Sequence, residues 1–166
     1  MTCAMSARIP LRGKEAKAIL TDFMSRLQFG EDAFGSKPLV EKVQLRDGEL
    51  ILVNGEPIIL RKRSQLLPTL KFDSAVKGLA RVVVDRGAIP HICNGADIMV
   101  KGVRSVDGEF VKGALVLVVD ETYGKHLAIG EALVDSASIR EMEKGKVVSN
   151  LHFVGDDAWE AMKAIG

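Results

Sequence analysis

Clustered cations and scattered histidines are the side chains in this sequence whose types and spacing bear on chemistry. The run Arg61-Lys62-Arg63, followed by Lys71, gathers positive charge of the kind that neutralises phosphate groups, and each phosphate contact adds close to one unit to the salt dependence of binding. The same charges also commonly protect an exposed sheet edge, so both interpretations stay open at this point. The three histidines, at positions 91, 126 and 152, and the two cysteines, at positions 3 and 93, match no metal-ligand spacing. We therefore expect neither a metal ion nor a cofactor.

The motifs typical of enzymes are absent from the sequence. It contains no GxSxG, GxxxxGK[ST] or HExxH pattern and no glycine-rich dinucleotide fingerprint. Its carboxylates are scattered, and isolated carboxylates on strands are far more common as solvated charges than as acid–base pairs. We therefore expect a non-catalytic protein; the alternative is an enzyme with a cryptic site at His126 or His152.

Composition indicates an ordinary globular protein with an uneven charge distribution. The chain has 166 residues, of which 47% are hydrophobic and 27% charged, and it contains no apolar run long enough for a membrane helix. With no signal-peptide pattern and only two cysteines, we expect a soluble, cytoplasmic protein and no membrane contact. The net charge of +1 combines +4 in residues 1–80, where 13 Lys and Arg face nine Asp and Glu, with −3 in residues 81–166. This asymmetry is a weak indication of a polyanionic partner.

Periodicity in the first half predicts one helix followed by a strand meander. Apolar residues at three- and four-residue steps predict a helix over 14–27, with Gly30 as its stop. The pairs Asp47-Gly48 and Asn54-Gly55 are typical of hairpin turns. They separate three expected strands, at 42–46, 49–53 and 57–61. We expect the stretch 66–79 to pack between two domains, with the boundary at about residue 78.

The second half predicts many short strands and two short helices. The expected strands are 81–85, 96–103, 114–119, 126–134, 147–148 and 151–154. A helix is expected over 87–94, and a capping box from Ser138 to Glu141 predicts another. A helical turn is expected around Trp159. This pattern favours a small, partly open barrel.

One continuous run in the second half resembles a known RNA-binding module. The residues from Asp85 to Met99, DRGAIPHICNGADIM, are similar to the opening of a PUA domain: a strand, an Asp-x-Gly-Ala turn, a short helix, and Gly-Ala-Asp-Ile-Met entering the next strand. The strand His126-Leu127-Ala128-Ile129-Gly130 and the turn Gly145-Lys146 also fit this module. The resemblance covers about residues 79–154.

The flanking segments extend the resemblance to a family. Arg61-Lys62-Arg63 followed by Leu67-Pro68-Thr69-Leu70-Lys71, and the ending Asn150-Leu151-His152-Phe153 with Asp156-Asp157-Ala158-Trp159, resemble the malignant T-cell-amplified family and its yeast translation machinery-associated relatives. The compact length and sparse aromatic residues are more similar to archaeal members. The resemblance implies an α+β pre-PUA domain at 1–78 and a mainly β PUA pseudo-barrel at 79–166, with two short helices.

The resemblance also implies a function. Members of the family act on the small ribosomal subunit, with the PUA half near the tRNA acceptor end and the pre-PUA half on ribosomal RNA. Eukaryotic members work with a density-regulated partner that carries a start-codon-selection domain. We therefore expect a translation-associated RNA-binding protein that contacts tRNA, small-subunit rRNA or both. The alternative is an accessory RNA-binding module for tRNA or rRNA modification, of the pseudouridine or archaeosine type. Oligomeric state stays open.

The candidate contact residues fall into two sets. The expected PUA groove comprises Arg86, Gly87, Ala88, Gly95, Ala96, Asp97, Met99, Lys101, Lys125, His126, Ala128 and Gly130. The expected pre-PUA cluster comprises Arg61, Lys62, Arg63 and Lys71.

Different physical properties place these residues in the groove. Gly87 and Ala88 either offer free N–H groups that favour a phosphate or form an ordinary turn, and Asp97 would accept from a 2′-OH or a base amine. The small face that includes Ala128 and Gly130 either packs very closely or leaves a shallow groove. Phe110 and Tyr123 fall in turns, where such rings stack on bases or, more often, cover a core edge.

Overall fold

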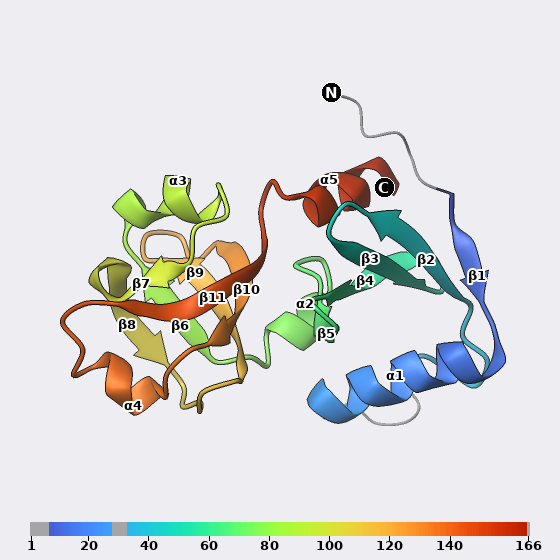
Figure 1. Cartoon of the computed structure of the whole chain (residues 1–166), viewed down its shortest axis with the longest axis horizontal. Helices are drawn as coiled ribbons and strands as arrows, with labels where there is room; N and C mark the ends of the chain where they lie inside the picture. Colours follow the sequence, from blue (N-terminus) through green and yellow to red (C-terminus); the bar gives the residue numbers. More distant parts are fainter. Residues whose placement is uncertain (1–6, 28–32, 166) are drawn as a thin grey trace.

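The chain folds into two lobes, each built on its own sheet (Figure 1). The computed structural model describes residues 7–27 and 33–165. The first sheet has five strands in the order β1-β2-β3-β4-β5, and the second has six in the order β7-β11-β10-β9-β6-β8. The expected architecture, an α+β region followed by a mainly β half-barrel, is confirmed. None of the described helices is both long and apolar enough to cross a membrane.

The first lobe is a meander that follows the predicted hairpin signals. Its elements are β1 (Ile9–Leu11), α1 (Gly13–Leu27), β2 (Val40–Leu45), β3 (Gly48–Val53), β4 (Glu56–Lys62), β5 (Gln65–Pro68) and α2 (Asp73–Val76). The predicted helix and three strands are therefore present, and the predicted stop at Gly30 lies outside the described residues. At Gly48, φ is +138° and a Cβ would collide with the backbone oxygen of Arg61, so the β2–β3 turn requires glycine.

The second lobe is a sheet that curls towards a barrel. Its elements are β6 (Arg81–Val84), η1 (Arg86–Ala88), α3 (Ile89–Ile92), β7 (Ile98–Met99), η2 (Val100–Gly102), β8 (Val103–Asp107), β9 (Leu115–Asp120), β10 (His126–Ala132), α4 (Ser136–Ile139) and β11 (Lys146–Phe153). The two edge strands, β7 and β8, are consecutive in the chain and are joined by η2. The chain therefore crosses from one edge of the sheet to the other in a single short turn.

Two local predictions in this lobe were wrong. The strand expected over 96–103 is broken by η2, a tight helical turn over Val100–Gly102 that is closed by the bond from the Val103 N–H to the Val100 oxygen. The capping box from Ser138 to Glu141 does not form, because the helix starts earlier. The buried Ser136 hydroxyl accepts from the Phe110 N–H and donates to the Phe110 oxygen, which sets the helix start at Ser136.

The last helix, α5 (Asp157–Ile165), returns to the first lobe. Its buried Met162 packs with Val43, Leu50 and Leu52, whereas Ile51 and Val53 pack with α1. Because alternate residues of a strand face opposite sides, α1 and α5 cover opposite faces of the first sheet (Figure 1). The predicted division at residue 78 groups α5 with the second domain, but in space this helix completes the first lobe.

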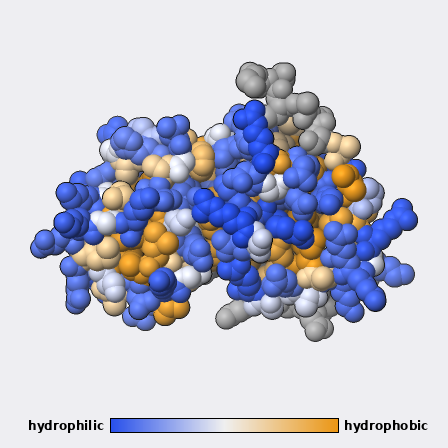
Figure 2. Space-filling view, viewed as in Figure 1, coloured by the Kyte–Doolittle hydropathy of each residue, from blue (hydrophilic) through white to orange (hydrophobic). Residues whose placement is uncertain are grey.

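A shared core joins the two lobes. Leu70 and Val76, from the stretch expected to lie between domains, pack in one cluster with Leu117, Ile129 and Leu151 of the second sheet. Figure 2 shows hydrophilic side chains over much of both lobes on this face, with apolar side chains between them. The lobes are therefore held together by buried apolar contact rather than by a linker alone.

Candidate nucleic-acid interface

Five of the predicted groove residues gather at one end of the half-barrel, which we call the barrel-end surface. It comprises η1, η2, the adjoining Arg104 and the β9–β10 turn (residues 121–125). The Asp85 N–H donates to the Gly102 oxygen at 2.9 Å, and the Glu121 N–H donates to the Val84 oxygen at 3.0 Å. These bonds bring together Arg86, Gly87, Ala88, Lys101 and Lys125, of which all but Ala88 are exposed.

The Asp85 carboxylate contacts two parts of this surface, the Ala88 N–H and the Arg104 side chain. Its Oδ1 accepts from the Ala88 N–H at 2.9 Å, so that donor is occupied and the predicted phosphate contact through it is wrong. Its Oδ2 lies 3.9 Å from Arg104, whose Nε lies 3.3 Å from Glu121. Sequence reasoning missed Arg104 because its two acidic partners come from other strand ends, and no local pattern connects them.

A second group of predicted residues lies at the turn between α3 and β7. Gly95 and Ala96 are exposed in this turn, and Met99, at the end of β7, keeps 46% of its surface in contact with water. Gly95 has a φ of +95°. A Cβ built on it would lie in ordinary van der Waals contact with the ring of Phe153, so the positive φ, and not lack of space, is what favours glycine in this turn.

Asp97 in this turn is committed to the protein itself. Its Oδ1 accepts from the Asn150 N–H at 2.9 Å, and its Oδ2 pairs with Lys146 at 3.2 Å. The Asn150 amide in turn donates to the oxygens of Ile92 and Ala96. Asp97 therefore positions the turn through β11. The signal that could have revealed Asn150 is a polar side chain inside an apolar strand, because buried polar groups are almost always hydrogen-bonded.

The small face of β10 packs closely and leaves no groove. Ala128 is fully buried in the core, and a Cβ at Gly130 would collide with the Ser149 oxygen and the Val148 side chain. Both residues therefore lie inside the half-barrel, and their predicted place on a groove wall was wrong. His126 is half-buried beside α2, where it adds to the larger effect of the Lys77 hydrogen bond in lowering the pKa of Asp73.

The predicted pre-PUA cluster lies at the junction of the lobes, where its side chains have partners. Arg61 pairs with Glu49 at 3.1 Å on the neighbouring strand. Lys62 Nζ donates to the Leu151 oxygen at 2.8 Å. The other two bonds run from Arg63 to the Ser149 hydroxyl and from Lys71 Nζ to the Met162 oxygen, each at 3.3 Å. Lys62, Arg63 and Lys71 thus connect the end of the first sheet to segments 86 to 91 residues further along the chain, and Arg63 and Lys71 remain exposed.

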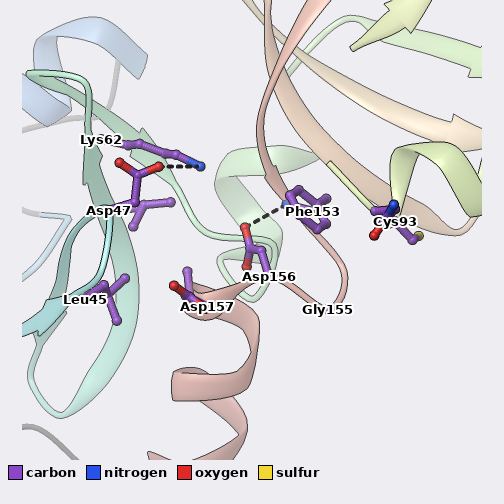
Figure 3. Close-up of a pocket in the computed structure, with 11 residues that line it drawn as sticks. Leu45, Asp47, Lys62, Cys93, Phe153, Gly155, Asp156 and Asp157 are labelled. Atoms are coloured by element: carbon purple, nitrogen blue, oxygen red, sulfur yellow. Dashed lines mark hydrogen bonds and ion pairs between the residues drawn. The ribbon is translucent and has the colours of Figure 1, made fainter. Parts of the chain in front are cut away.

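A cleft of about 380 Å³ opens beside this junction (Figure 3). Lys62 and Asp47 face each other across its rim at 3.7 Å, while Asp156, Asp157 and Phe153 approach from the other side. The acidic side chains outnumber the single lysine in the lining, which disfavours phosphate there. Within residues 7–27 and 33–165, no three His, Cys, Asp or Glu side chains are grouped to hold a metal ion.

His152 and Asp156 form a buried polar link at the same junction. His152 Nε2 accepts from the Leu70 N–H at 3.2 Å, so Nδ1 carries the proton and donates to Asp156 Oδ2 at 2.8 Å. Asp156 also accepts from the N–H groups of Phe153 and Trp159. Burial raises the pKa of Asp156, but the bonds from His152 and the two backbone donors outweigh it, so its pKa lies below the ordinary value. The environment of His152 is that of a structural histidine rather than of a cryptic active site.

The lowered pKa of Asp156 predicts a specific acid sensitivity. A carboxyl with a lower pKa in the folded state stabilises the fold fully above its unfolded pKa of about 4, and this contribution is lost as pH falls through the folded value. Asp156→Asn should therefore flatten, but not abolish, the fall in unfolding free energy below about pH 4, because Asp120 and Asp73 also have lowered pKa values.

Urea unfolding across the acid range measures this slope. Asp107→Asn, at an exposed carboxylate, is the matched control and should keep the wild-type slope. An Asp156→Asn slope equal to that of the wild type would contradict the prediction.

Comparisons with known proteins agree with this geometry. Residues 80–154 match the PUA domain family. The chain is 37% identical over 152 residues to the uncharacterized protein MJ1432 of Methanocaldococcus jannaschii, covering 90% of this chain and 93% of that protein. It is 30% identical over 137 residues to translation machinery-associated protein 20 of Saccharomyces cerevisiae, covering 78% and 76%.

A solved structure shows the same arrangement of both lobes. The hypothetical protein PH0734.1 of Pyrococcus horikoshii matches with a TM-score of 0.74 and 34% identity, over 94% of this chain and 99% of that one. The similarity thus spans the first lobe as well as the half-barrel, in both sequence and structure. This chain belongs to the PUA-domain family that includes translation machinery-associated protein 20 and the malignant T-cell-amplified proteins.

Proposed function

We propose that this protein is a non-catalytic RNA-binding factor of the translation machinery. In this proposal the half-barrel contacts tRNA near its acceptor end, and the first lobe contacts rRNA of the small subunit. The observation that carries the proposal is the barrel-end surface, a group of exposed cations on a PUA domain. The name of the yeast relative, translation machinery-associated protein 20, supports the cellular setting.

The charges of the barrel-end surface suit a short stretch of RNA backbone. Arg86, Lys101 and Lys125 are exposed, and Arg104 is the member held by acidic partners. Cations of this kind position a nucleic acid through its phosphates, whereas shape and unpaired bases supply selectivity. Because residues 81–166 carry a net charge of −3, attraction of phosphate to this half depends on local groups of cations such as this one. Such an arrangement fits one defined RNA end better than broad binding to any polyanion.

The contact of the first lobe depends on fewer cations than the sequence alone indicated. Arg61 and Lys62 are engaged within the protein, so Arg63 and Lys71, which remain exposed, are the members of the cluster that can also reach phosphate. The proposal for rRNA contact therefore rests on these two side chains. A protein partner with a start-codon-selection domain belongs to the same proposal, and affinity capture with the full chain tests it.

Charge reversal at the barrel-end surface tests the proposal. Arg86→Glu, Lys101→Glu and Lys125→Glu together should lower tRNA affinity at least about tenfold and reduce the salt slope by up to about three units, one for each phosphate that is no longer neutralised. Filter binding over a range of salt concentrations measures both quantities. Arg140→Glu with Lys144→Glu, near α4 at the other side of the lobe, is the control and should leave both nearly unchanged.

Sedimentation and crosslinking distinguish a role on the ribosome from a role in RNA modification. The wild-type protein should co-migrate with the small ribosomal subunit, alone or with tRNA, and crosslinks should map to a tRNA 3′ end. Failure to co-migrate would overturn the translational role. Crosslinks to internal stems, with a modification enzyme captured alongside, would favour the accessory-module alternative.

A further inference from the structure

Tyr123 is an aromatic side chain left almost entirely in water. It is 80% exposed, in the turn between β9 and β10. The other aromatic side chains in the described part of the chain are buried or half-buried, including Phe110, which packs in the half-barrel core. The exposed ring therefore has no packing role that accounts for its position.

The turn that carries Tyr123 is rigidly constructed. The buried carboxylate of Asp120 accepts three backbone N–H bonds, from Thr122 at 2.9 Å, from Tyr123 at 2.6 Å and from Lys125 at 2.8 Å. The Gly124 N–H donates to the Asp120 backbone oxygen, and the Asp120 N–H donates to the Lys125 oxygen. The Tyr123 bond is the largest cause of the lowered pKa of Asp120, which keeps the carboxylate charged and accepting. The turn is thus ordered before any partner arrives, which reduces the entropic cost of binding.

The surroundings of the ring fit a nucleobase better than a protein surface. Lys125 Nζ stands 5.8 Å from the ring centroid, so one face meets a cation and the other meets solvent. The remaining turn residues, Glu121, Thr122 and Gly124, are exposed and not apolar. Aromatic anchors of protein interfaces lie in well-packed pockets whose surrounding contacts exclude water, whereas this ring is 80% exposed on a polar turn. A lone ring beside a cation is the arrangement that stacks bases of single-stranded RNA.

We propose that Tyr123 is the stacking platform for one unpaired RNA base, with Lys125 at the adjacent phosphate. The inference rests on the proposed RNA binding and adds to it the side chain that recognises an unpaired nucleotide. The platform lies on the barrel-end surface, so an RNA end held by the cations there presents its unpaired base to the ring.

The single tyrosine of the chain makes the test direct. Because the sequence contains one Tyr, 3-fluorotyrosine incorporation labels position 123 alone, and its ¹⁹F resonance reports on that ring. A short single-stranded RNA should shift the resonance, whereas a matched oligonucleotide with abasic sugars should not. Tyr123→Ala should weaken binding of the single-stranded RNA about 5- to 150-fold. Tyr123→Phe should bind within about twofold of the wild type, because stacking needs the ring and not the hydroxyl.

The outcomes separate this inference from the function on which it rests. If RNA binds with equal affinity to the wild type and to Tyr123→Ala, or if the abasic oligonucleotide shifts the resonance equally, the platform is refuted while RNA binding stands. A ring that serves a protein surface would give this result. If neither tRNA nor single-stranded RNA binds the wild-type protein, the proposed function itself fails.

Discussion

Replacing His152 with Ala is expected to lower the free energy of unfolding by about 3–5 kcal/mol. The imidazole is fully buried and bonded on both nitrogens, to the Leu70 N–H and to the Asp156 carboxylate. Its removal leaves a cavity, an unpaired buried donor at Leu70 and a carboxylate without its side-chain donor. All three effects lower the stability of one site, where Leu70 contacts His152 of β11 and Asp156 before α5.

The His152→Ala substitution should also weaken the packing between the two lobes. Leu70 belongs to the shared core, so freeing its backbone loosens the segment that packs against the second sheet. Urea unfolding monitored by the fluorescence of the single tryptophan, which lies in α5, measures the change. The matched control is His91→Ala, at an exposed position of α3, which should change stability by less than about 0.5 kcal/mol. Equal stability of the two variants would show that the His152 link contributes little.

Gly130→Ala is the second substitution with a large expected effect, about 2–4 kcal/mol of lost stability. A Cβ at this position would collide with the Ser149 backbone oxygen as well as with the Val148 side chain. A side chain can rotate away, but a carbonyl within the β10–β11 ladder cannot move without breaking sheet hydrogen bonds. The register between these strands also shifts beside this glycine, so the close approach is part of how β11 crosses the sheet.

Thermal and urea unfolding measure this loss, and Gly78→Ala is the matched control. The nearest atom to a Cβ at Gly78 is the Ala75 oxygen at 3.6 Å, an ordinary contact, and its φ is not in the left-handed region. That variant should stay within about 1 kcal/mol of the wild type, because a compatible Gly→Ala change mainly reduces the freedom of the unfolded chain. A Gly130→Ala protein as stable as the Gly78→Ala control would contradict the packing argument.

Much of the fold could be predicted because its signals are local. The Asp47-Gly48 turn, the periodicity of α1 and the run from Asp85 to Met99 each act within a few residues, and the structure contains the hairpin, helix and PUA opening that they indicate. Arg86, which is exposed, lies within that run, and the exposed Lys101 follows it by two residues. Local backbone geometry and short-range hydrogen bonds depend on residues that are adjacent in the chain, so they can be predicted from the sequence alone.

The partners and the burial of the side chains at the lobe junction could not be predicted in this way. Lys62 reads as a free cation in a basic run, yet it donates to the Leu151 oxygen 89 residues further on. Ala128 and Gly130 read as the wall of a groove, yet they pack against β11, and α5 belongs in space to the first sheet.

The sequence by itself thus determined the family and most of the helices and strands, and it predicted a set of candidate RNA contacts. Only the tertiary structure decided which cations are engaged internally, which small residues are buried, and that Tyr123 stands alone on an ordered turn. The reason is physical: burial and ion pairing depend on which distant segments meet, and that is set by the packing of the two lobes rather than by any local pattern.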